Sequence, residues 1–234
     1  MRVPSVPAAP HKRTKAARRA GGAPEASPSR KQNILLVAER LFAAHGFHGV
    51  SIRDIAEEAG VPLALVGYYY GPKVELYYEI YRQRARYIEE RMRTLALAQR
   101  EAPRGKLLEE IVKAFVLPAL KVAATPDGRI FMRLVARVVS AHTPEDDAII
   151  REVFDPLAYA FMDALVAALP HATRGQIAWC YQFAVGALLH HMTDQRVERL
   201  SRGENRADDE DSAAPLLVRF ITAGMRGVCG KSPP

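Results

Sequence analysis

The apolar residues of this 234-residue chain recur at the spacing of amphipathic helices from residue 31 onward. No segment alternates between apolar and polar residues for long enough to predict a strand. The apolar stripes predict helices over about residues 32–45, 51–60, 62–69, 72–99, 107–118, 130–139, 153–169, 177–189 and 214–228. We expect Pro118 to end or kink its helix, and Pro156 to bend the helix that contains it. The pattern therefore predicts an all-α protein.

The first three predicted helices have the arrangement of a helix-turn-helix head. Gly46 is placed to end the first helix, and Ser51 can cap the second. Gly60 supplies a tight turn, and Pro62 opens the third helix where its missing N–H costs nothing. Two short helices joined by a glycine turn, after a longer supporting helix, predict a helix-turn-helix motif over about residues 51–70.

The helical stripes that follow this head predict a second unit. We place the head at residues 27–87 and a C-terminal helical bundle at 88–228, followed by a short tail at 229–234. Residues 174–192 are apolar nearly all round, so this helix must be covered on both sides. Together with residues 214–228 it carries more apolar surface than one chain needs to cover, which predicts a two-fold homodimer through these two helices.

The net charge of +7 is concentrated at the start of the chain. Residues 1–30 carry a net charge of +6, which leaves +1 for the remaining 204 residues. Residues 1–29 are rich in Pro, Ala, Ser and Gly, and such a composition cannot offset the entropy of ordering. We expect residues 1–26 to form a disordered basic arm. It either lies along nucleic-acid phosphates or serves only as a solubilising leader.

Composition excludes several other classes of protein. No apolar run approaches the ~20 residues that a membrane helix needs, and no apolar segment follows the basic N-terminus as in a signal peptide. Cys180 and Cys229 have no metal-ligand spacing, which predicts a reducing cytoplasm and no metal site. No nucleophile stands beside a base, so we expect neither an enzyme nor a cofactor. The acidic pair Asp146-Asp147 is interpreted as exposed charge.

Three blocks of sequence carry a resemblance to a known family. They are an ILxxAxxLFxxxGF run from Ile34 to Phe47, an S-x-R-x-I-A-x-x-A-G-V run from Ser51 to Val61, and the run Tyr68-Tyr69-Tyr70-Gly71-Pro72-Lys73. With these blocks at this spacing, residues 31–80 resemble the TetR family of transcriptional regulators. The resemblance implies a DNA-binding head and an all-helical body for effector binding and dimerisation. The body matches only in architecture, so it identifies no effector.

The resemblance also implies which residues meet double-stranded DNA. The expected DNA-binding residues are Arg30, Lys31, Ser51, Arg53, Pro62, Leu63, Leu65, Gly67, Tyr68, Tyr69 and Lys73. Lys73 would meet a phosphate at a helix start, and Arg30 with Lys31 would end the flexible arm near the DNA backbone. The family commonly has polar residues at positions 63, 65 and 67, so direct base readout must be sparse here. Specificity is expected to depend on Arg53, apolar contacts and DNA shape.

Aromatic and basic residues of the body supply candidates for an effector pocket. They are Phe115, Arg133, Arg137, Phe154, Trp179 and Phe183. The aromatic members would look the same as ordinary core, and each arginine alone is also typical of a solvated basic face. Sequence reasoning leaves these alternatives open.

These observations favour a ligand-responsive repressor. It would bind a near-palindromic operator as a homodimer and leave it when a small molecule binds. The alternative is an architectural DNA-binding dimer without an effector. An enclosed cavity in the body distinguishes the two, because an assembly module should be packed solid.

Overall fold

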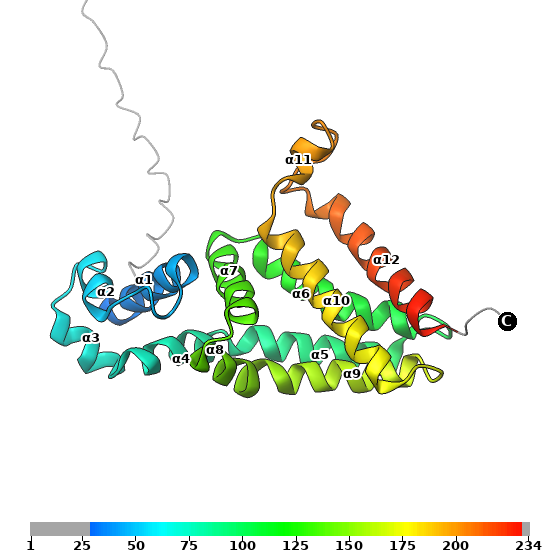
Figure 1. The fold of residues 1–234 in the computed structure, drawn as a ribbon, viewed down its shortest axis with the longest axis horizontal. Helices are drawn as coiled ribbons and strands as arrows, with labels where there is room; N and C mark the ends of the chain where they lie inside the picture. Colours follow the sequence, from blue (N-terminus) through cyan, green and yellow to red (C-terminus); the bar gives the residue numbers. More distant parts are fainter. Residues whose placement is uncertain (1–28, 231–234) are drawn as a thin grey trace, which may run out of the picture.

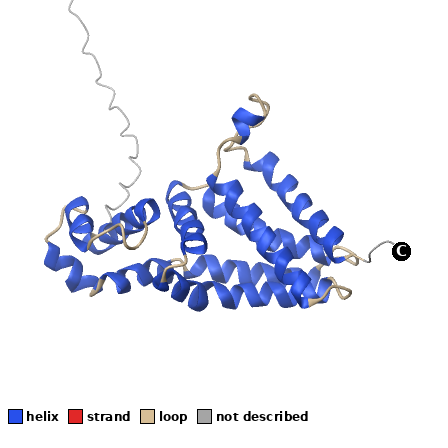
Figure 2. Cartoon of the chain, in the orientation of Figure 1, coloured by secondary structure: helices blue, strands red, loops and turns tan. Residues whose placement is uncertain are grey.

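The computed structural model describes residues 29–230 (Figure 1). The predicted basic arm at 1–26 lies outside the described residues, as does most of the predicted tail at 229–234. Residues 29–230 form helices joined by turns and contain no strand (Figure 2). The predicted all-α class is confirmed.

The head begins with one longer helix and two short ones. They are α1 (Arg30–His45), α2 (Ile52–Glu58) and α3 (Leu63–Tyr70). The Oγ of Ser51 accepts a hydrogen bond from the N–H of Asp54, and the Asp54 carboxylate accepts one from the N–H of Ser51, which fixes the start of α2. Gly60 then adopts a φ of +65° at the turn into α3, a conformation that favours glycine. The sequence therefore sets both ends of α2 through local interactions.

The helix predicted over 72–99 is divided into α4 (Lys73–Gln83) and α5 (Ala85–Glu101). Arg84, between them, leaves helical geometry at φ −92° and ψ 10°. Its guanidinium reaches the carboxylate of Glu39 on α1, with Nη2 at 2.9 Å and 2.8 Å from the two oxygens and Nε at 3.1 Å from one of them. Glu39 is only 4% exposed, and its burial raises the pKa while the hydrogen bonds from Arg84 lower it. A tertiary ion pair thus accompanies a break that has no local glycine or proline.

The body is a bundle of the remaining helices. They are α6 (Leu107–Ala123), α7 (Pro126–Ala141), α8 (Pro144–Ile149), the π-helix η1 (Ile150–Phe154), α9 (Asp155–Ala168), α10 (Arg174–Thr193), α11 (Val197–Leu200) and α12 (Glu210–Cys229). Helix α9 runs along α5, and α12 lies on the outside against α6 and α10 (Figure 1). Helix α7 stands between head and body, because it packs against α1, α6 and α10.

Helical structure continues past both prolines that the sequence analysis singled out. Pro118 lies inside α6, which continues to Ala123 instead of ending there. Pro156 lies in the first turn of α9, directly after the π-helical turn Ile150–Phe154. The wider π-helical turn at Ile150–Phe154 was not predicted.

Polar contacts fix the head against the body. On α7, the Nη2 of Arg137 donates to the carbonyl oxygen of Ala44 at 2.9 Å, near the end of α1. On α4, the hydroxyl of Tyr77 donates to Asp146 at 2.7 Å. Asp146 was expected to be exposed, but it is buried. Thr143, which caps α8, donates a hydrogen bond to the Asp146 carboxylate and accepts one from the Asp146 N–H, so the buried acid has its partners. Burial raises the pKa of Tyr77, so the phenol remains a hydrogen-bond donor over the physiological pH range.

Replacing Arg84 tests how much its ion pair with Glu39 contributes to stability. We expect Arg84→Met to lower the free energy of unfolding by about 3–5 kcal/mol, because it leaves the buried Glu39 carboxylate without a partner. The double variant Glu39→Met/Arg84→Met should recover most of the loss, and urea unfolding measures both. A double variant as unstable as the single one would contradict this role of the pair.

Candidate DNA-binding surface and ligand cavity

Helix α3 presents an apolar, uncharged surface to the outside. Val66 and Tyr70 point into the core of the head, whereas Leu63 is half exposed and Tyr68 is 81% exposed. A Cβ built at Gly67 would meet no atom within 4 Å, so this stretch of the helix is open to an approaching molecule. Nothing in α3 carries a charge.

Most of the expected DNA-binding residues are accessible. The exposed ones are Arg30, Lys31, Ser51, Arg53, Pro62, Leu63, Gly67 and Tyr68, and the half-buried ones are Leu65 and Tyr69. Ser51 and Arg53 begin α2, which packs against α3, so the two groups belong to neighbouring helices. The turn between α2 and α3 is held by a hydrogen bond from the N–H of Val61 to the carbonyl oxygen of Ala56 at 3.0 Å.

Lys73 is held by a loop of the head. Its Nζ donates to the carbonyl oxygens of Phe47 and Val50, each at 3.0 Å, and lies 4.2 Å from the centroid of the Phe47 ring. These carbonyls belong to the loop between α1 and α2. Two of the three N–H donors of the half-buried ammonium group are therefore bound to this loop, and contact of Lys73 with a phosphate stays a prediction.

Arg30 and Lys31 belong to the first turn of α1 rather than to the end of an arm. The hydroxyl of Tyr70, the last residue of α3, donates to the carbonyl oxygen of Lys31 at 2.7 Å. Burial raises the pKa of Tyr70 to about 12, so this phenol stays protonated as a donor. The start of α1 is therefore tied to the end of α3, and residues 1–28 join the described chain at that point.

The head itself carries little net charge. Residues 29–84 contain seven Lys and Arg residues against six Asp and Glu residues, a net charge of +1. One exposed arginine, Arg40, is paired with Glu58. Attraction to a polyanion within the described head therefore comes mainly from Arg30, Lys31 and Arg53.

The body contains a cavity of about 420 Å³ between α5, α6, α7, α9 and α10. Pockets for small molecules typically measure about 300–1,000 Å³ and have mostly apolar walls. The lining is largely apolar, and it includes Phe115, Val135, Phe154, Leu188 and Met192. Its polar members are Tyr87, Arg91, His142, Asp155, Tyr181 and Gln182.

Arg91 is the unusual member of this lining, since it is only 5% exposed. Its Nη1 donates to the hydroxyl of Tyr87 at 3.0 Å, and its Nη2 donates to the carbonyl oxygen of Phe115 at 3.1 Å. Its Nε is buried and has no acceptor among the described residues. The guanidinium carbon lies 4.7 Å from the Phe115 ring centroid and 5.3 Å from that of Phe161. A full positive charge is thus buried among aromatic rings.

The sequence suggested a different set of pocket residues. Phe115 and Phe154 do line the cavity, but Arg133, Arg137, Trp179 and Phe183 do not. Arg133 is exposed, and Arg137 is bound to the end of α1. Trp179 and Phe183 stack on each other on the outer side of α10, with ring centroids 5.8 Å apart. Sequence reasoning missed Arg91, although it lies between Tyr87 and Leu95 in a buried stripe with a spacing of four residues.

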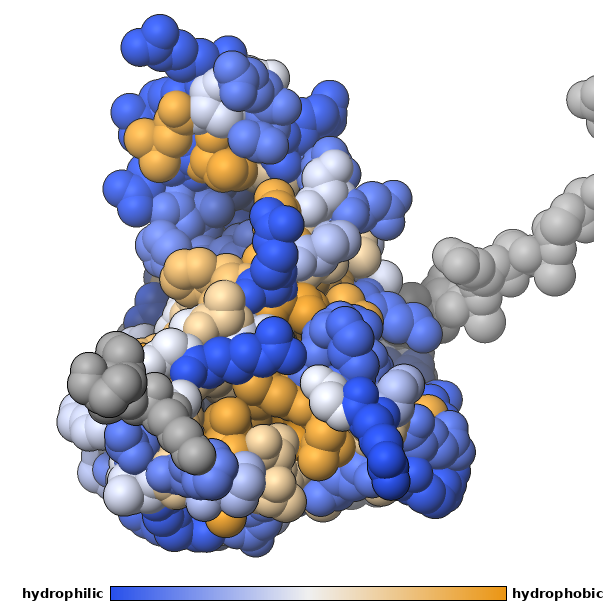
Figure 3. Space-filling view, turned by 90° about the vertical axis from the view of Figure 1, so that its right-hand side faces the viewer, coloured by the Kyte–Doolittle hydropathy of each residue, from blue (hydrophilic) through white to orange (hydrophobic). Residues whose placement is uncertain are grey.

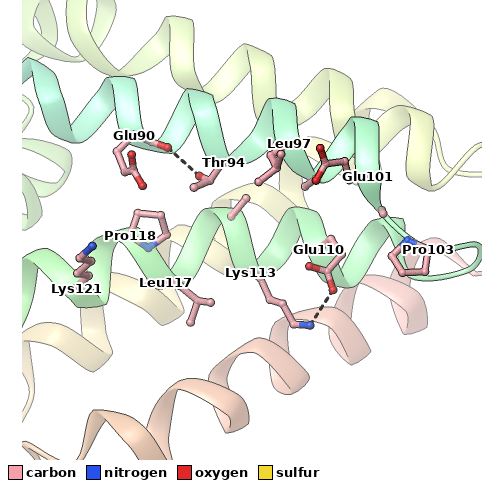
Figure 4. A pocket seen from close by; sticks show the side chains of 13 residues that line it. Glu90, Thr94, Leu97, Glu101, Pro103, Glu110, Lys113, Leu117, Pro118 and Lys121 are labelled. Carbon is pink, nitrogen blue, oxygen red and sulfur yellow. Dashed lines mark hydrogen bonds and ion pairs between the residues drawn. The ribbon is translucent and has the colours of Figure 1, made fainter.

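A second hollow lies between α5 and α6 (Figure 4). Leu97 and Leu117 line it, and charged residues such as Glu90, Glu101 and Lys121 surround them. Lys113 points toward Glu110, at 2.8 Å, rather than into the hollow. With its leucines exposed and its charges paired or solvated, this groove is less suited to hold a ligand than the cavity around Arg91.

Two family models match the chain. The model for bacterial regulatory proteins of the tetR family matches residues 34–80, and that for a tetracyclin repressor-like C-terminal domain matches residues 113–224. The chain belongs to the TetR family. It is therefore a transcriptional regulator with a helix-turn-helix DNA-binding domain and a C-terminal ligand-binding domain, in a family of non-enzymatic regulators. The predicted resemblance is confirmed.

Individual relatives agree with this assignment. The HTH-type transcriptional regulator BetI of Agrobacterium fabrum (strain C58 / ATCC 33970) is 38% identical over 80 residues, which cover 34% of this chain and 38% of BetI. The chain thus matches less than two fifths of that relative's length. The fatty acid degradation regulator FadR from Bacillus halodurans has the same fold, with a TM-score of 0.57 and 15% identity over 86% of this chain and 99% of FadR. PfmR from Thermus thermophilus gives a TM-score of 0.53 and 16% identity over 89% of this chain and 99% of PfmR.

Neither a membrane-spanning helix nor a metal-binding cluster occurs in the part of the chain that the structure describes. No helix there combines the length and the apolar character needed to cross a membrane. The same residues contain no group of three His, Cys, Asp or Glu side chains that could hold a metal ion. Two adjacent histidines on α10 each contact an acid, His190 with Asp194 at 3.0 Å and His191 with Glu210 at 3.2 Å.

The tyrosines of α3 provide a matched pair of variants. We expect Tyr68→Ala to weaken DNA binding by about tenfold, which corresponds to ~1.4 kcal/mol, without changing stability, because this side chain is almost fully exposed. Tyr70→Phe should instead lower the free energy of unfolding by about 1 kcal/mol, because it removes the hydrogen bond to Lys31. Fluorescence anisotropy with labelled DNA and thermal unfolding separate the two effects. Loss of stability in Tyr68→Ala would argue against an outward role for its ring.

Arg53 and Lys73 are expected to differ in the salt dependence of binding. Each Arg53 that neutralises a phosphate contributes about 0.9 to the slope of log K against log salt, so Arg53→Ala should reduce that slope. Lys73→Met should leave the slope unchanged but lower the free energy of unfolding by about 1–3 kcal/mol, since two carbonyls lose their donor. Titrations at several salt concentrations measure the slopes. A reduced slope with unchanged stability in Lys73→Met would show that this ammonium group contacts DNA after all.

Proposed function

We propose that the protein is a ligand-responsive repressor that binds a near-palindromic operator as a homodimer. Two heads would read half-sites about one helical turn, ~34 Å, or slightly more apart. A small molecule in the body would favour a state whose heads are wrongly spaced, and so release the operator. As a regulator of chromosomal DNA, it would act in the cytoplasm.

One observation carries this proposal: the helices that line the cavity also hold the head. Tyr87 and Arg91 on α5 follow Arg84, which binds Glu39 of α1. Val135 on α7 lines the cavity next to Arg137, which binds the end of α1. A ligand that displaces α5 or α7 would therefore change the position of α1 directly, without a long chain of intermediate contacts.

The outer faces of α10 and α12 support a dimer. Their large apolar side chains point away from the chain's own core: Trp179, Phe183, Leu216, Phe220 and Val228. Phe183 and Phe220 are 60% and 69% exposed and border one groove of about 270 Å³ between the two helices. An end-on view of the body shows hydrophobic residues exposed between hydrophilic ones (Figure 3). A second copy would cover this surface in a four-helix interface, because a two-fold axis makes the surface self-complementary.

The proposed DNA contacts of the head include few hydrogen bonds to bases, and the basic arm would add electrostatic affinity. Leu63 and Tyr68 offer apolar and hydroxyl contacts rather than paired hydrogen bonds to bases. Specificity would then rest on Arg53, contacts with thymine methyl groups and DNA shape. The arm precedes α1, whose start is bonded to the end of α3, so the +5 charge of residues 1–26 would add affinity next to the groove that α3 occupies.

The cavity favours a regulator over an architectural DNA-binding dimer. A protein that serves only for assembly gains nothing from an unfilled volume of about 420 Å³ with a buried cation in its wall. A charge buried in this way lowers stability unless a ligand or partner compensates for it.

Charges placed on the proposed dimer surface should separate the two subunits. We expect Phe183→Glu/Phe220→Glu to sediment as a folded monomer at micromolar concentration, where the unmodified chain is a dimer. The carboxylates would have to be buried without partners in the interface. Tyr159→Glu on α9 is the matched control, because Tyr159 is similarly exposed but lies outside α10 and α12. A Phe183→Glu/Phe220→Glu variant that remains dimeric would place the interface elsewhere.

Selection from a random duplex pool tests the whole proposal. It should be done with the full chain and with a chain that begins at Ser29, which is retained because it caps α1. A short palindrome enriched by both proteins supports a sequence-specific regulator and assigns affinity alone to the arm. Diffuse binding that disappears with the arm would favour the architectural alternative.

A further inference from the structure

We propose that the cavity selects ligands that carry one carboxylate on an apolar body, and that Arg91 is the residue that binds the carboxylate. This inference rests on the proposed function, since it names the chemical class of the effector for the same cavity. It depends on one observation that the family assignment does not supply: the uncompensated charge of Arg91.

The electrostatic argument begins with burial. Arg91 is 5% exposed, and no acidic residue among residues 29–230 forms an ion pair with it. A buried charge is normally paired, because removing it from water costs more than neutral hydrogen bonds return. Arg84, at the break between α4 and α5, follows this rule through Glu39. Arg91 has only a phenol and a carbonyl as acceptors, so an anion that entered the cavity would gain an ion pair with it.

The geometry indicates a carboxylate. A guanidinium is a planar fork of donors that fits the two oxygens of a carboxylate, and the Nε of Arg91 has no acceptor among the described residues. Its neighbour Tyr87 has a hydroxyl that accepts from Nη1 and retains its own proton for donation to a second oxygen. Tyr181 also lines the cavity, and burial raises the pKa of its phenol, so it too remains a donor. The guanidinium of Arg91 and two phenol hydroxyls thus belong to the wall of the cavity that an anion would enter.

The other lining residues limit the rest of the ligand. Most are aliphatic or aromatic, which favours an apolar body. Asp155 is the one acidic residue in the lining, and its carboxylate would repel a second negative charge on the ligand. The cavity therefore favours monocarboxylates over dicarboxylates and phosphorylated molecules.

Binding to the dimeric protein, without DNA, tests the inference directly. The probes are octanoate, 4-phenylbutyrate and 1-naphthoate, each compared with its neutral primary amide, and with the matching dicarboxylate octanedioate for the first. Thermal shift and isothermal titration calorimetry measure binding. We expect at least one acid to bind about tenfold or more tightly than its amide, the effect of a charged hydrogen-bonded pair. Equal binding of acids and amides, tighter binding of octanedioate, or no binding of any acid would overturn the proposal.

Variants separate a ligand-binding role of Arg91 from a structural one. Arg91→Met keeps the length of the side chain and removes the charge, so the preference for acids should disappear. The melting temperature of the unliganded protein should stay the same or rise, because an uncompensated buried charge is lost. Arg133→Met on α7 is the matched control, since it removes an exposed arginine outside the cavity and should leave both properties unchanged. A lower melting temperature in Arg91→Met together with unchanged preference for acids would assign Arg91 to structure alone.

Operator release is measured separately, so that the two proposals can fail independently. Acids that bind through Arg91 but leave the DNA complex intact would contradict ligand-induced release while supporting the inference. Neutral molecules that bind in the cavity and release DNA equally well in Arg91→Met would support the repressor and overturn the inference.

Discussion

The structure depends first on the pairing of a buried carboxylate with an arginine at a helix break. Glu39 is buried in α1, and burial raises its pKa, so an ionised side chain there requires the guanidinium of Arg84. The same guanidinium lies 5.2 Å from the centroid of the Phe131 ring on α7. The pair therefore joins the head, the α4–α5 joint and the central helix of the body at one point.

This point is also close to the cavity. The Phe131 ring contacts Tyr87, with centroids 5.9 Å apart, and Tyr87 in turn accepts a hydrogen bond from Arg91. Two arginines that are seven residues apart thus differ in their partners. Arg84 forms an ion pair with Glu39, whereas Arg91 forms none with any acid among residues 29–230. The first supports the arrangement of the head on the body, and the second lowers stability unless an anion enters the cavity.

Sequence alone predicted the elements that depend on local signals. The Ser51 cap and the Gly60 turn fix α2 and α3, and the stripes of the body gave most of its helices. The break at Arg84 was missed because its partner is 45 residues away in sequence. Pro118 did not end α6, because burial against neighbouring helices outweighs one lost hydrogen bond. The family motifs gave the regulator class, but no local pattern distinguishes a residue that lines a cavity from one in the core.

The predicted pocket and DNA-binding residues show the same limit of sequence-based prediction. Trp179 and Phe183 were candidates for the pocket because they are aromatic residues of the body, but they lie on the outer side of α10 and do not line the cavity. Lys73 was expected at a phosphate because of its position, and its bonds to two carbonyls of the α1–α2 loop could not be predicted from the sequence. Arg91 carried a readable signal, a basic residue in the middle of a buried stripe, and only the structure shows that no acid compensates for it.

The π-helical turn at Ile150–Phe154 has a consequence for how related cavities can vary in size. Its first and last residues both line the cavity, and a π-helix holds one more residue in the turn than an α-helix does. Loss of a single residue there would restore ordinary helical winding between α8 and α9 and leave both helices in register. The volume of the cavity can therefore change through the length of the chain at one turn, while every wall residue contributed by α5, α7 and α10 stays the same.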